Sequence, residues 1–341
     1  MRSTTWAATC SLSSSPSTSI PTSITPRQRN NNMRIVFMGT PEFAVVSLQA
    51  LLSSEHEIVG VFTRADMPKN RGMKLTMPPV KELALQHDIP VCQPASLRED
   101  AAFEALQAFA PDIVVVASYG LILPKRVLAL PRYGCINVHA SLLPKYRGAS
   151  PINAAILDGC EETGVTIMQM ARGLDTGDML LSRAVPIGEE DTYGTLHDKL
   201  AALGGELLLE ALEQIENNTV KAVKQDDSLS CYAHMIQKED TAVSFRLPAK
   251  VVSCRIRGYD PAPGAYGLLG GEKLKLFGAR LYDDSAAADP GAILRCDKKG
   301  LLVQAEGGTV LIREVQISGK KRMPAADCFR GRPQLLSESF R

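Results

Sequence analysis

The sequence of 341 residues lacks the usual metal-ligand patterns and any long apolar run. Its eight cysteines are scattered, with no CxxC pair and no cluster of Cys and His, so the zinc spacings are absent and we predict no metal. Scattered cysteines of this kind are typical of reduced thiols in an intracellular compartment. No uninterrupted apolar segment approaches about 18 residues, which predicts neither a transmembrane helix nor a membrane partner.

Acidic residues are missing from the first 32 positions. This segment is crowded with Ser and Thr and contains Arg2, Arg27 and Arg29, whereas the first carboxylate of the chain is Glu42. The composition, without an apolar core, is typical of an organellar transit peptide rather than of a secretory signal. We therefore predict that residues 1–32 are a disordered transit peptide for a mitochondrion or a chloroplast; the alternative is a polar tail without a targeting role.

A dinucleotide fingerprint is also missing. The apolar run over 33–39 predicts a buried strand, and it ends in Gly39-Thr40-Pro41, where a dinucleotide-binding enzyme would carry GxGxxG. With a single glycine followed by proline, the cradle for a pyrophosphate is absent. This disfavours a nicotinamide-dependent dehydrogenase, although the layout is Rossmann-like.

Apolar runs and helical periodicity alternate through the first two thirds of the chain. This alternation predicts an α/β domain over 33–220, with a Rossmann-like, doubly wound, mostly parallel sheet. The predicted elements are strands at 33–39, 58–63 and 113–117, an antiparallel pair at 164–170 and 179–187, and helices at 43–51, 80–86 and 193–215.

The pattern changes after a polar segment, residues 221–239, which we predict to be a linker. Residues 240–341 contain short β-like runs broken by Gly and Pro, which predict a small OB-like β-barrel domain. This region holds 17 Lys and Arg against 11 Asp and Glu, whereas residues 33–239 hold 18 against 26. A basic domain beside an acidic body suggests a polyanionic partner, and on charge alone a basic face without a partner is an equal alternative.

Two polar side chains stand two positions apart in an apolar, β-branched segment: Asn137 and His139. If the segment is a strand, both side chains point to the same face. Asp175, in a loop between Gly173 and Gly177, would complete a trio able to polarise a carbonyl and manage a proton. No Ser or Cys stands in a nucleophile elbow, so we predict direct acyl-type transfer without a covalent enzyme intermediate. Each residue alone also fits a structural role as a turn, a core histidine or a loop cap.

Several longer motifs contain these residues, and they carry a resemblance. From Met33 to the C-terminus the chain resembles methionyl-tRNA formyltransferases, which use 10-formyltetrahydrofolate. The motifs are RIVFMGTPEFA at 34–44, NRGMKL at 70–75, YGLILPKRVL at 119–128, GCINVHASLLPKYRGASPI at 134–152, ETGVTIMQM at 162–170 and GLDTGDML at 173–180.

The resemblance implies an enzyme that moves a formyl group from 10-formyltetrahydrofolate to the α-amino group of methionyl initiator tRNA, for translation initiation in an organelle. Asn137, His139 and Asp175 match the catalytic residues of the family. The segment that contacts the folate is matched by Ser141, Leu142, Leu143 and Pro144. Whether His139 carries a proton or acts as a fixed charge stays open at the level of the sequence.

The resemblance also implies two contact surfaces for tRNA. Arg71 matches an arginine in a loop that contacts the acceptor stem, and the basic C-terminal barrel matches a second surface. Arg64, Lys69 and Lys74 add positive charge around that loop. The loop departs from the bacterial pattern at Arg64-Ala65-Asp66. A monomer would suffice for this function, and we predict one.

Two classes of alternative remain. Formyltransferases acting on glycinamide ribonucleotide or on a nucleotide sugar share the trio, but the first is expected to have a Gly/Ser-rich phosphate loop after the first strand, which is absent here. The second is expected to have a dehydrogenase-like domain, for which the chain has no room. An RNA-binding protein that kept the scaffold without activity would not need Asn137, His139 and Asp175 together.

Overall fold

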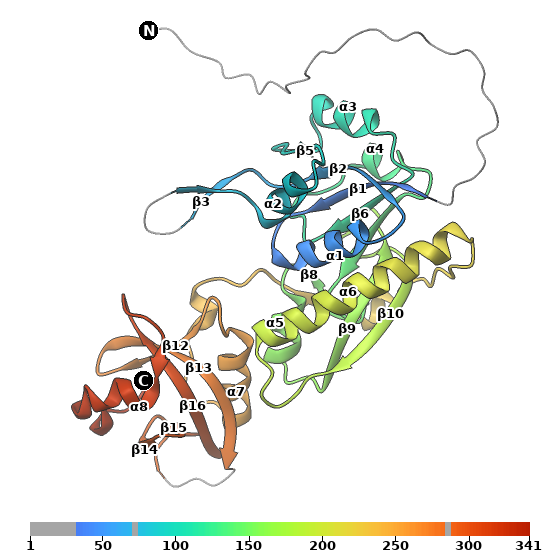
Figure 1. Cartoon of the computed structure of the whole chain (residues 1–341). Coiled ribbons are helices and arrows are strands. Elements are labelled where there is room, and N and C mark those ends of the chain that lie inside the picture. The colour runs from blue at the N-terminus through green and yellow to red at the C-terminus, as the bar shows by residue number, and fades with distance from the viewer. Residues whose placement is uncertain (1–31, 70–73, 284–287) are drawn as a thin grey trace, which may run out of the picture. The chain divides into compact units, whose positions relative to one another are not determined.

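The computed structural model describes residues 32–69, 74–283 and 288–341 (Figure 1). The predicted transit peptide falls almost entirely in residues 1–31, outside the described residues, and so does Arg71 in the loop over 70–73. Residues 33–341 form one compact unit. Among the described helices, none is both long enough and apolar enough to cross a bilayer.

A seven-stranded sheet organises the N-terminal region, in the order β10-β9-β7-β6-β1-β2-β5. Five neighbouring strands, from β7 to β5, run parallel, and β9 and β10 are added antiparallel at one edge. The mostly parallel sheet and its antiparallel edge pair are therefore confirmed. The strands are β1 (Arg34–Gly39), β2 (Glu57–Phe62), β5 (Val91–Cys92), β6 (Ile113–Ala117), β7 (Cys135–His139), β9 (Glu162–Gln169) and β10 (Met179–Pro186).

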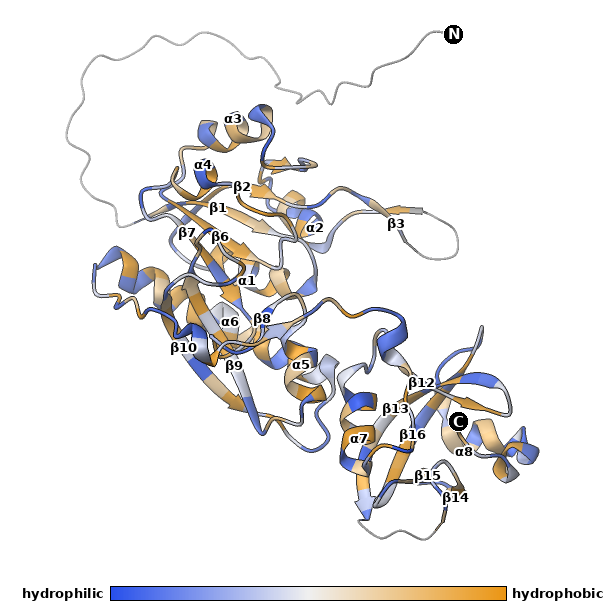
Figure 2. Ribbon diagram, turned by 180° about the vertical axis from the view of Figure 1, so that it is seen from behind, coloured by the Kyte–Doolittle hydropathy of each residue, from blue (hydrophilic) through white to orange (hydrophobic). Residues whose placement is uncertain are grey.

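Helices cover both faces of this sheet, because alternate side chains of β1 are apolar on both faces and both faces must be buried. Ile35 and Phe37 belong to the core on one face, whereas Val36 and Met38 belong to the core on the other. Because both faces are buried, the strands read as continuous apolar runs, which stand out in Figure 2. The first core includes α1 (Glu42–Leu52), α2 (Pro79–Gln86), α5 (Pro151–Leu157) and α6 (Tyr193–Glu216), and the second includes α3 (Asp100–Ala108) and α4 (Lys125–Leu128).

The C-terminal region is built on an antiparallel sheet in the order β12-β13-β16-β15-β14, with β17 added beside β16. The predicted C-terminal β domain is confirmed, and its strands pair antiparallel. The elements are α7 (Ala249–Gly258), β12 (Ala265–Leu269), β13 (Glu272–Asp283), β14 (Ile293–Asp297), β15 (Gly300–Ala305), β16 (Gly308–Ile317), β17 (Met323–Pro324), α8 (Ala325–Arg330) and the 3-10 turn η3 (Pro333–Ser337).

Buried hydrogen bonds join α5 and the start of α6 to α7. Asn153 on α5 donates its side-chain amide to the carbonyl of Gly258 (2.7 Å), at the end of α7. Arg257 donates to the carbonyl of Asp191 (2.7 Å), just before α6. Asp191 is 8% exposed and its carboxylate accepts from Lys199 at 2.7 Å. The start of the long helix is therefore also a point of attachment for the C-terminal region.

Candidate active site

Strand β7 carries the two side chains that sequence reasoning paired. It lies inside the sheet between β6 and β9, and Ile136 and Val138 point into the core that contains α6. Asn137 and His139 alternate with them and so share the opposite face. His139, at the carboxyl end of the strand, is 5% exposed, and Asn137 is half-buried. The predicted strand and the shared face are confirmed.

The hydrogen bonding of His139 fixes which nitrogen can exchange a proton. Nε2 lies 3.0 Å from the carbonyl oxygen of Tyr146. A carbonyl can only accept, so Nε2 carries the hydrogen and donates it. The other nitrogen, Nδ1, lies 3.7 Å from Oδ2 of Asp175. Nδ1 therefore faces the Asp175 carboxylate without a hydrogen in the neutral ring, and a protonated imidazole would form an ion pair with Asp175.

Asp175 reaches this position from the loop between β9 and β10. Its backbone is in the left-handed region, with φ at +52°. Its Oδ2 also accepts from the backbone N–H of Gly148 (2.8 Å), so the carboxylate is held by a second group. The loop approaches β9 closely: a Cβ placed on Gly177 would lie 1.7 Å from the carbonyl oxygen of Gln169. Only glycine fits there, and the loop has little freedom on that side.

The Asn137 amide has no hydrogen-bond partner among the described residues of the protein. A half-buried amide in that state can accept or donate to a ligand without first breaking a bond in the protein. Its place on the same strand face as His139 makes it a candidate donor to a carbonyl oxygen that becomes negatively charged.

The predicted folate segment, residues 141–144, forms a tight turn after β7. The Ser141 hydroxyl is fully buried and donates to the carbonyl of Lys145 (2.6 Å). Thr166 on β9 donates to the carbonyl of Ser141 (2.7 Å) and accepts from the N–H of Leu143 (3.2 Å), so the turn is tied to the sheet. Leu143 is 7% exposed, whereas Leu142 and Pro144 are half-buried. Ser141 therefore shapes the turn, and Leu142 and Pro144 present the accessible surface.

The predicted tRNA-contacting loop belongs to a hairpin of β3 (Met67–Lys69) and β4 (Lys74–Thr76), visible in Figure 1. Lys69 and Lys74 pair across the last described position of the hairpin. Arg64, at its base, is exposed and donates to the carbonyl of Gly120 (3.0 Å).

Asp66 anchors the hairpin to the body of the domain. Lys81 on α2 donates to both of its oxygens, at 2.9 and 2.8 Å, and Gln93 donates to Oδ1 at 2.8 Å. These hydrogen bonds, that of Lys81 first, hold the pKa of the Asp66 carboxyl below its usual value.

Sequence reasoning missed three residues that support the trio. Tyr146 provides the carbonyl for His139, and Gly148 provides the N–H for Asp175; both stand inside the motif at 134–152, but their main-chain roles leave no sign in the side-chain pattern. The third is Gln225, in the predicted linker, which donates to the carbonyls of Asp175 and Gly177. No signal in the polar segment 221–239 pointed to it.

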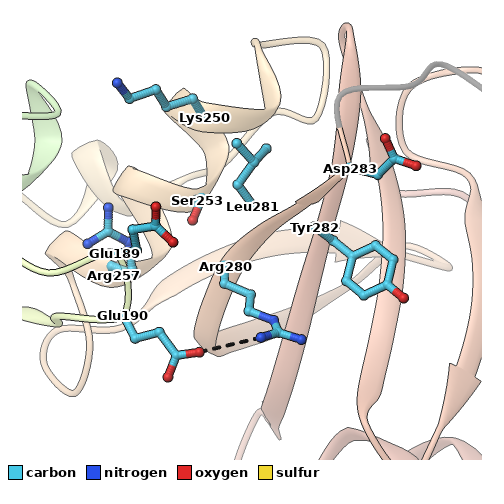
Figure 3. Close-up of a pocket in the computed structure, with 9 residues that line it drawn as sticks. All are labelled: Glu189, Glu190, Lys250, Ser253, Arg257, Arg280, Leu281, Tyr282 and Asp283. Atoms are coloured by element: carbon cyan, nitrogen blue, oxygen red, sulfur yellow. Dashed lines mark ion pairs between the residues drawn. The ribbon is translucent and has the colours of Figure 1, made fainter.

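A separate pocket of about 320 Å³ lies between the loop before α6 and strand β13 (Figure 3). Its charges balance one another: Glu190 is within 3.6 Å of Arg280, and Arg313 donates to the same carboxylate. Its described lining contains none of the trio. The lining residues are Glu189, Glu190, Lys250, Ser253, Arg257, Arg280, Leu281, Tyr282 and Asp283. Among the residues that the structure describes, no group of His, Cys, Asp and Glu could hold a metal ion.

Family models match both regions of the chain. The formyl transferase model covers residues 33–212, and the model of the formyl transferase C-terminal domain covers residues 235–333. The solved structure of WlaRD, a sugar 3N-formyl transferase, superposes with a TM-score of 0.63 over 85% of this chain and 99% of that chain, at 19% identity, a likeness that concerns the fold. Fold and matched regions together define a formyl transferase.

Relatives with similar sequences show which kind of formyl transferase this chain resembles. The chain is 46% identical to the methionyl-tRNA formyltransferase of Geobacter sulfurreducens, over 88% of this chain and 94% of that protein. It is 48% identical to that of Citrifermentans bemidjiense, over 88% of this chain and 93% of that protein. The chain belongs to the methionyl-tRNA formyltransferase family.

Proposed function

We propose that this enzyme transfers the formyl group of 10-formyltetrahydrofolate to the α-amino group of methionine on initiator tRNA. The observation that carries the proposal is the arrangement at the carboxyl end of β7. There, the Asn137 amide, which has no partner among the described residues, shares a strand face with His139, whose Nδ1 lies 3.7 Å from the carboxylate of Asp175. This set suits a carbonyl carbon that becomes tetrahedral and needs no covalent enzyme intermediate.

The reaction forms a bond between the methionyl nitrogen and the formyl carbon and breaks the bond from that carbon to N10 of the folate. The attacking amine loses one proton and N10 gains one, so the enzyme must relay a proton without consuming it. Asn137 donates to the oxygen as it becomes an oxyanion. His139, protonated at Nδ1 beside Asp175, supplies positive charge to the same oxygen and a proton for the departing nitrogen.

We further propose that the described turn at 141–144 supports the folate, with Leu142 and Pro144 as its accessible side chains. The hairpin residues Arg64, Lys69, Arg71 and Lys74 are proposed to contact the tRNA. Cations near a phosphate backbone supply affinity that falls with salt.

A basic pocket of about 520 Å³ supports a second tRNA-contacting surface, on the C-terminal domain. Lys238, Lys273 and Lys275 line it, and none of its described lining residues is acidic. Lys273 Nζ lies 4.1 Å from the ring centre of Tyr266, which also lines the pocket. Clustered ammonium groups beside an aromatic ring suit a phosphate backbone with an adjacent base.

The test is a comparison of acceptors. The protein is incubated with labelled 10-formyltetrahydrofolate and with charged initiator tRNA, charged elongator Met-tRNA or glycinamide ribonucleotide. We expect label on initiator Met-tRNA, and label on the ribonucleotide alone would overturn the proposal. His139→Ala should reduce turnover with little change in tRNA affinity, whereas Arg71→Ala should raise the tRNA concentration needed for half-maximal rate.

The proposed site of action is a mitochondrion or a chloroplast, with a monomeric enzyme after removal of residues 1–32. The support is the composition of that segment, which has three arginines and no acidic residue. Residues 1–32 fused to a fluorescent protein should carry it into one or both organelles. A fusion that stays in the cytosol, as the unfused reporter does, would refute this part of the proposal.

A further inference from the structure

We infer that Gln225 is a positioning residue for the formyl transfer proposed above: its side-chain amide holds the Asp175 loop in the geometry that His139 requires. The inference rests on the proposed function, because it assigns importance to the position of Asp175. Gln225 stands in the segment between the two regions that the family models match, 33–212 and 235–333.

The Gln225 amide is buried, and both its oxygen and its two hydrogens take part in hydrogen bonds. The residue is 6% exposed. Its Nε2 donates to the carbonyl of Asp175 (2.8 Å) and to the carbonyl of Gly177 (2.7 Å). Its Oε1 accepts from Nε (3.0 Å) and Nη2 (2.8 Å) of Arg147. Both hydrogens of the amide thus go to the loop that carries the catalytic carboxylate, one on each side of Thr176.

Arg147 fixes the direction of that amide. A guanidinium has donors only, so it must meet Oε1, and the Nε2 end of the amide is then turned to the loop carbonyls. Arg147 is 2% exposed, and a buried charge of this kind is costly unless it is paired. Its counter-ion is Asp227, which accepts from Nη2 at 2.7 Å and is itself mostly exposed.

Main-chain pairing brings Gln225 to this place from both sides. Upstream, Val223 and Met179 exchange two backbone hydrogen bonds of 2.8 Å at the start of β10. Downstream, β11 (Tyr232–Ala233) pairs in parallel with β8 (Arg147–Gly148). The segment 223–233 is thereby attached to the start of β10 at one end and to β8 at the other.

The loop needs such support because of its backbone. Asp175 has φ at +52°, a region that costs free energy for residues other than glycine, and its carboxylate must lie beside Nδ1 of His139. Bonds to the carbonyls on both sides of Thr176 restrain the rotation that would turn the carboxylate away. A displacement of about 1 Å in a catalytic group can cost on the order of a hundredfold in rate.

The decisive variant is Gln225→Glu, with Gln225→Ala beside it. A carboxylate can still accept from Arg147, so the buried cation stays paired, but it has no hydrogen for the two carbonyls. We expect kcat to fall on the order of tenfold to a hundredfold, with KM for folate and tRNA changed less than about twofold. The matched control is Gln237→Ala, which removes an exposed glutamine from the same predicted linker and should leave kcat unchanged. A folded Gln225→Glu enzyme with wild-type kcat would overturn the inference.

A double-mutant cycle separates positioning from a general loss of structure. If Gln225 acts through Asp175, adding Gln225→Glu to Asp175→Asn should lower kcat by less than about twofold. A further drop as large as that of the single variant would refute the inference. Hydrogen–deuterium exchange over residues 171–178 provides a readout that needs no substrate. Exchange there should rise about tenfold in Gln225→Glu and stay unchanged in Gln237→Ala. If the wild type transferred no formyl group to Met-tRNA while this exchange difference held, the proposed function would fail, and only the finding that Gln225 holds the Asp175 loop would stand.

Discussion

At the scale of single residues, the tautomer of His139 depends on how firmly Tyr146 is held. Tyr146 has φ at +58°, and its hydroxyl donates to Oδ2 of Asp158 (2.9 Å) with Cys160 Sγ at 3.1 Å. Burial first, and then the hydrogen bonds to Cys160 and Asp158, raise the pKa of the Tyr146 hydroxyl above its usual value, so it remains a donor. The ring thus anchors an unusual backbone whose carbonyl keeps the hydrogen of His139 on Nε2.

Asn137 should separate catalysis from stability. Because its amide has no partner among the described residues, Asn137→Ala should change the free energy of unfolding by less than about 0.5 kcal/mol. The same variant should lower kcat about 100- to 1,000-fold through loss of an oxyanion donor. The measurements are urea unfolding and steady-state kinetics with initiator Met-tRNA.

Asn153→Ala is the matched control, because we expect it to affect stability and not kcat. Its buried amide donates to Gly258 at 2.7 Å, so Asn153→Ala should lower the unfolding free energy by about 1–3 kcal/mol through the carbonyl left without a partner. Its kcat should stay near that of the wild type. A stability loss in Asn137→Ala as large as that of Asn153→Ala would contradict the catalytic interpretation.

At the scale of elements, the start of α6 is held by one carboxylate. Asp191 accepts from Lys199, from the N–H of Gly188 and from the hydroxyl of Thr195. Burial alone would raise the pKa of Asp191, but these three hydrogen bonds outweigh it and lower the pKa below its usual value. A carboxyl with a lowered pKa stabilises the folded state above its unfolded-state pKa of about 3.9, and this stabilisation disappears as pH falls through the folded-state pKa.

Asp191→Asn should therefore act in a pH-dependent way. At pH 7 we expect it to lower the unfolding free energy by about 1–3 kcal/mol, since hydrogen bonds to a charged group are lost. Urea unfolding in steps from pH 7 downward should show the gap between the two curves begin to close only below about pH 4 and close further as pH falls toward the lowered folded-state pKa of Asp191. Asp198→Asn, whose side chain is 84% exposed, should show about 0–1 kcal/mol at every pH. A gap between wild type and Asp191→Asn that does not narrow at all below about pH 4 would refute this role.

Elements with a strong local pattern could be predicted from the sequence. Strand β1 is apolar on both faces, and α6 repeats buried leucines at helical spacing over 24 residues. The short helices α3, α4, α5, α7 and α8 were missed, because four to ten residues carry too few repeats to reveal a period.

In the candidate site, too, some residues could be predicted from a local pattern and others could not. Asn137 and His139 could be paired because a strand alternates with a period of two. Gln225 could not be found, because a bond from its side chain to a carbonyl about 50 positions away leaves no local pattern. The contact between Gln225 and the Asp175 loop is formed only in the tertiary structure. A polar residue in a polar segment gives no sign of such a contact in the sequence.

At the scale of the whole molecule, charge is distributed by region. Lys238, at the end of the predicted linker, and Lys273 and Lys275 of the basic C-terminal domain line one pocket, whereas some other cations of this domain are paired with carboxylates. Arg322, for example, pairs with Asp260 and Glu314 and lies 4.2 Å from the ring centre of Phe277. Cations without an acidic neighbour are the ones available to a polyanion.

Removal of such a cation should change the salt dependence of tRNA binding. For Lys273→Gln we expect the slope of log affinity against log salt to become shallower by about 1, the value for one phosphate contact. Lys298→Gln removes the same charge from the exposed turn between β14 and β15 and should leave the slope unchanged. The two variants can be compared by filter binding between about 50 and 200 mM salt. Equal slopes for both variants would argue against this pocket as a tRNA contact.

The left-handed backbone at Asp175 limits which sequences can ever occupy this position. Besides glycine, Asn and Asp are the residues that enter that region most readily, and Asp alone among these supplies a carboxylate. In a complete substitution library, Asn and Gly should therefore give the best-folded proteins with strongly reduced but measurable activity, and Glu should keep the charge but lose both fit and rate. The substitutions at position 175 that preserve folding should therefore differ from those that preserve activity. No other acidic residue should replace Asp175 without loss of either stability or rate.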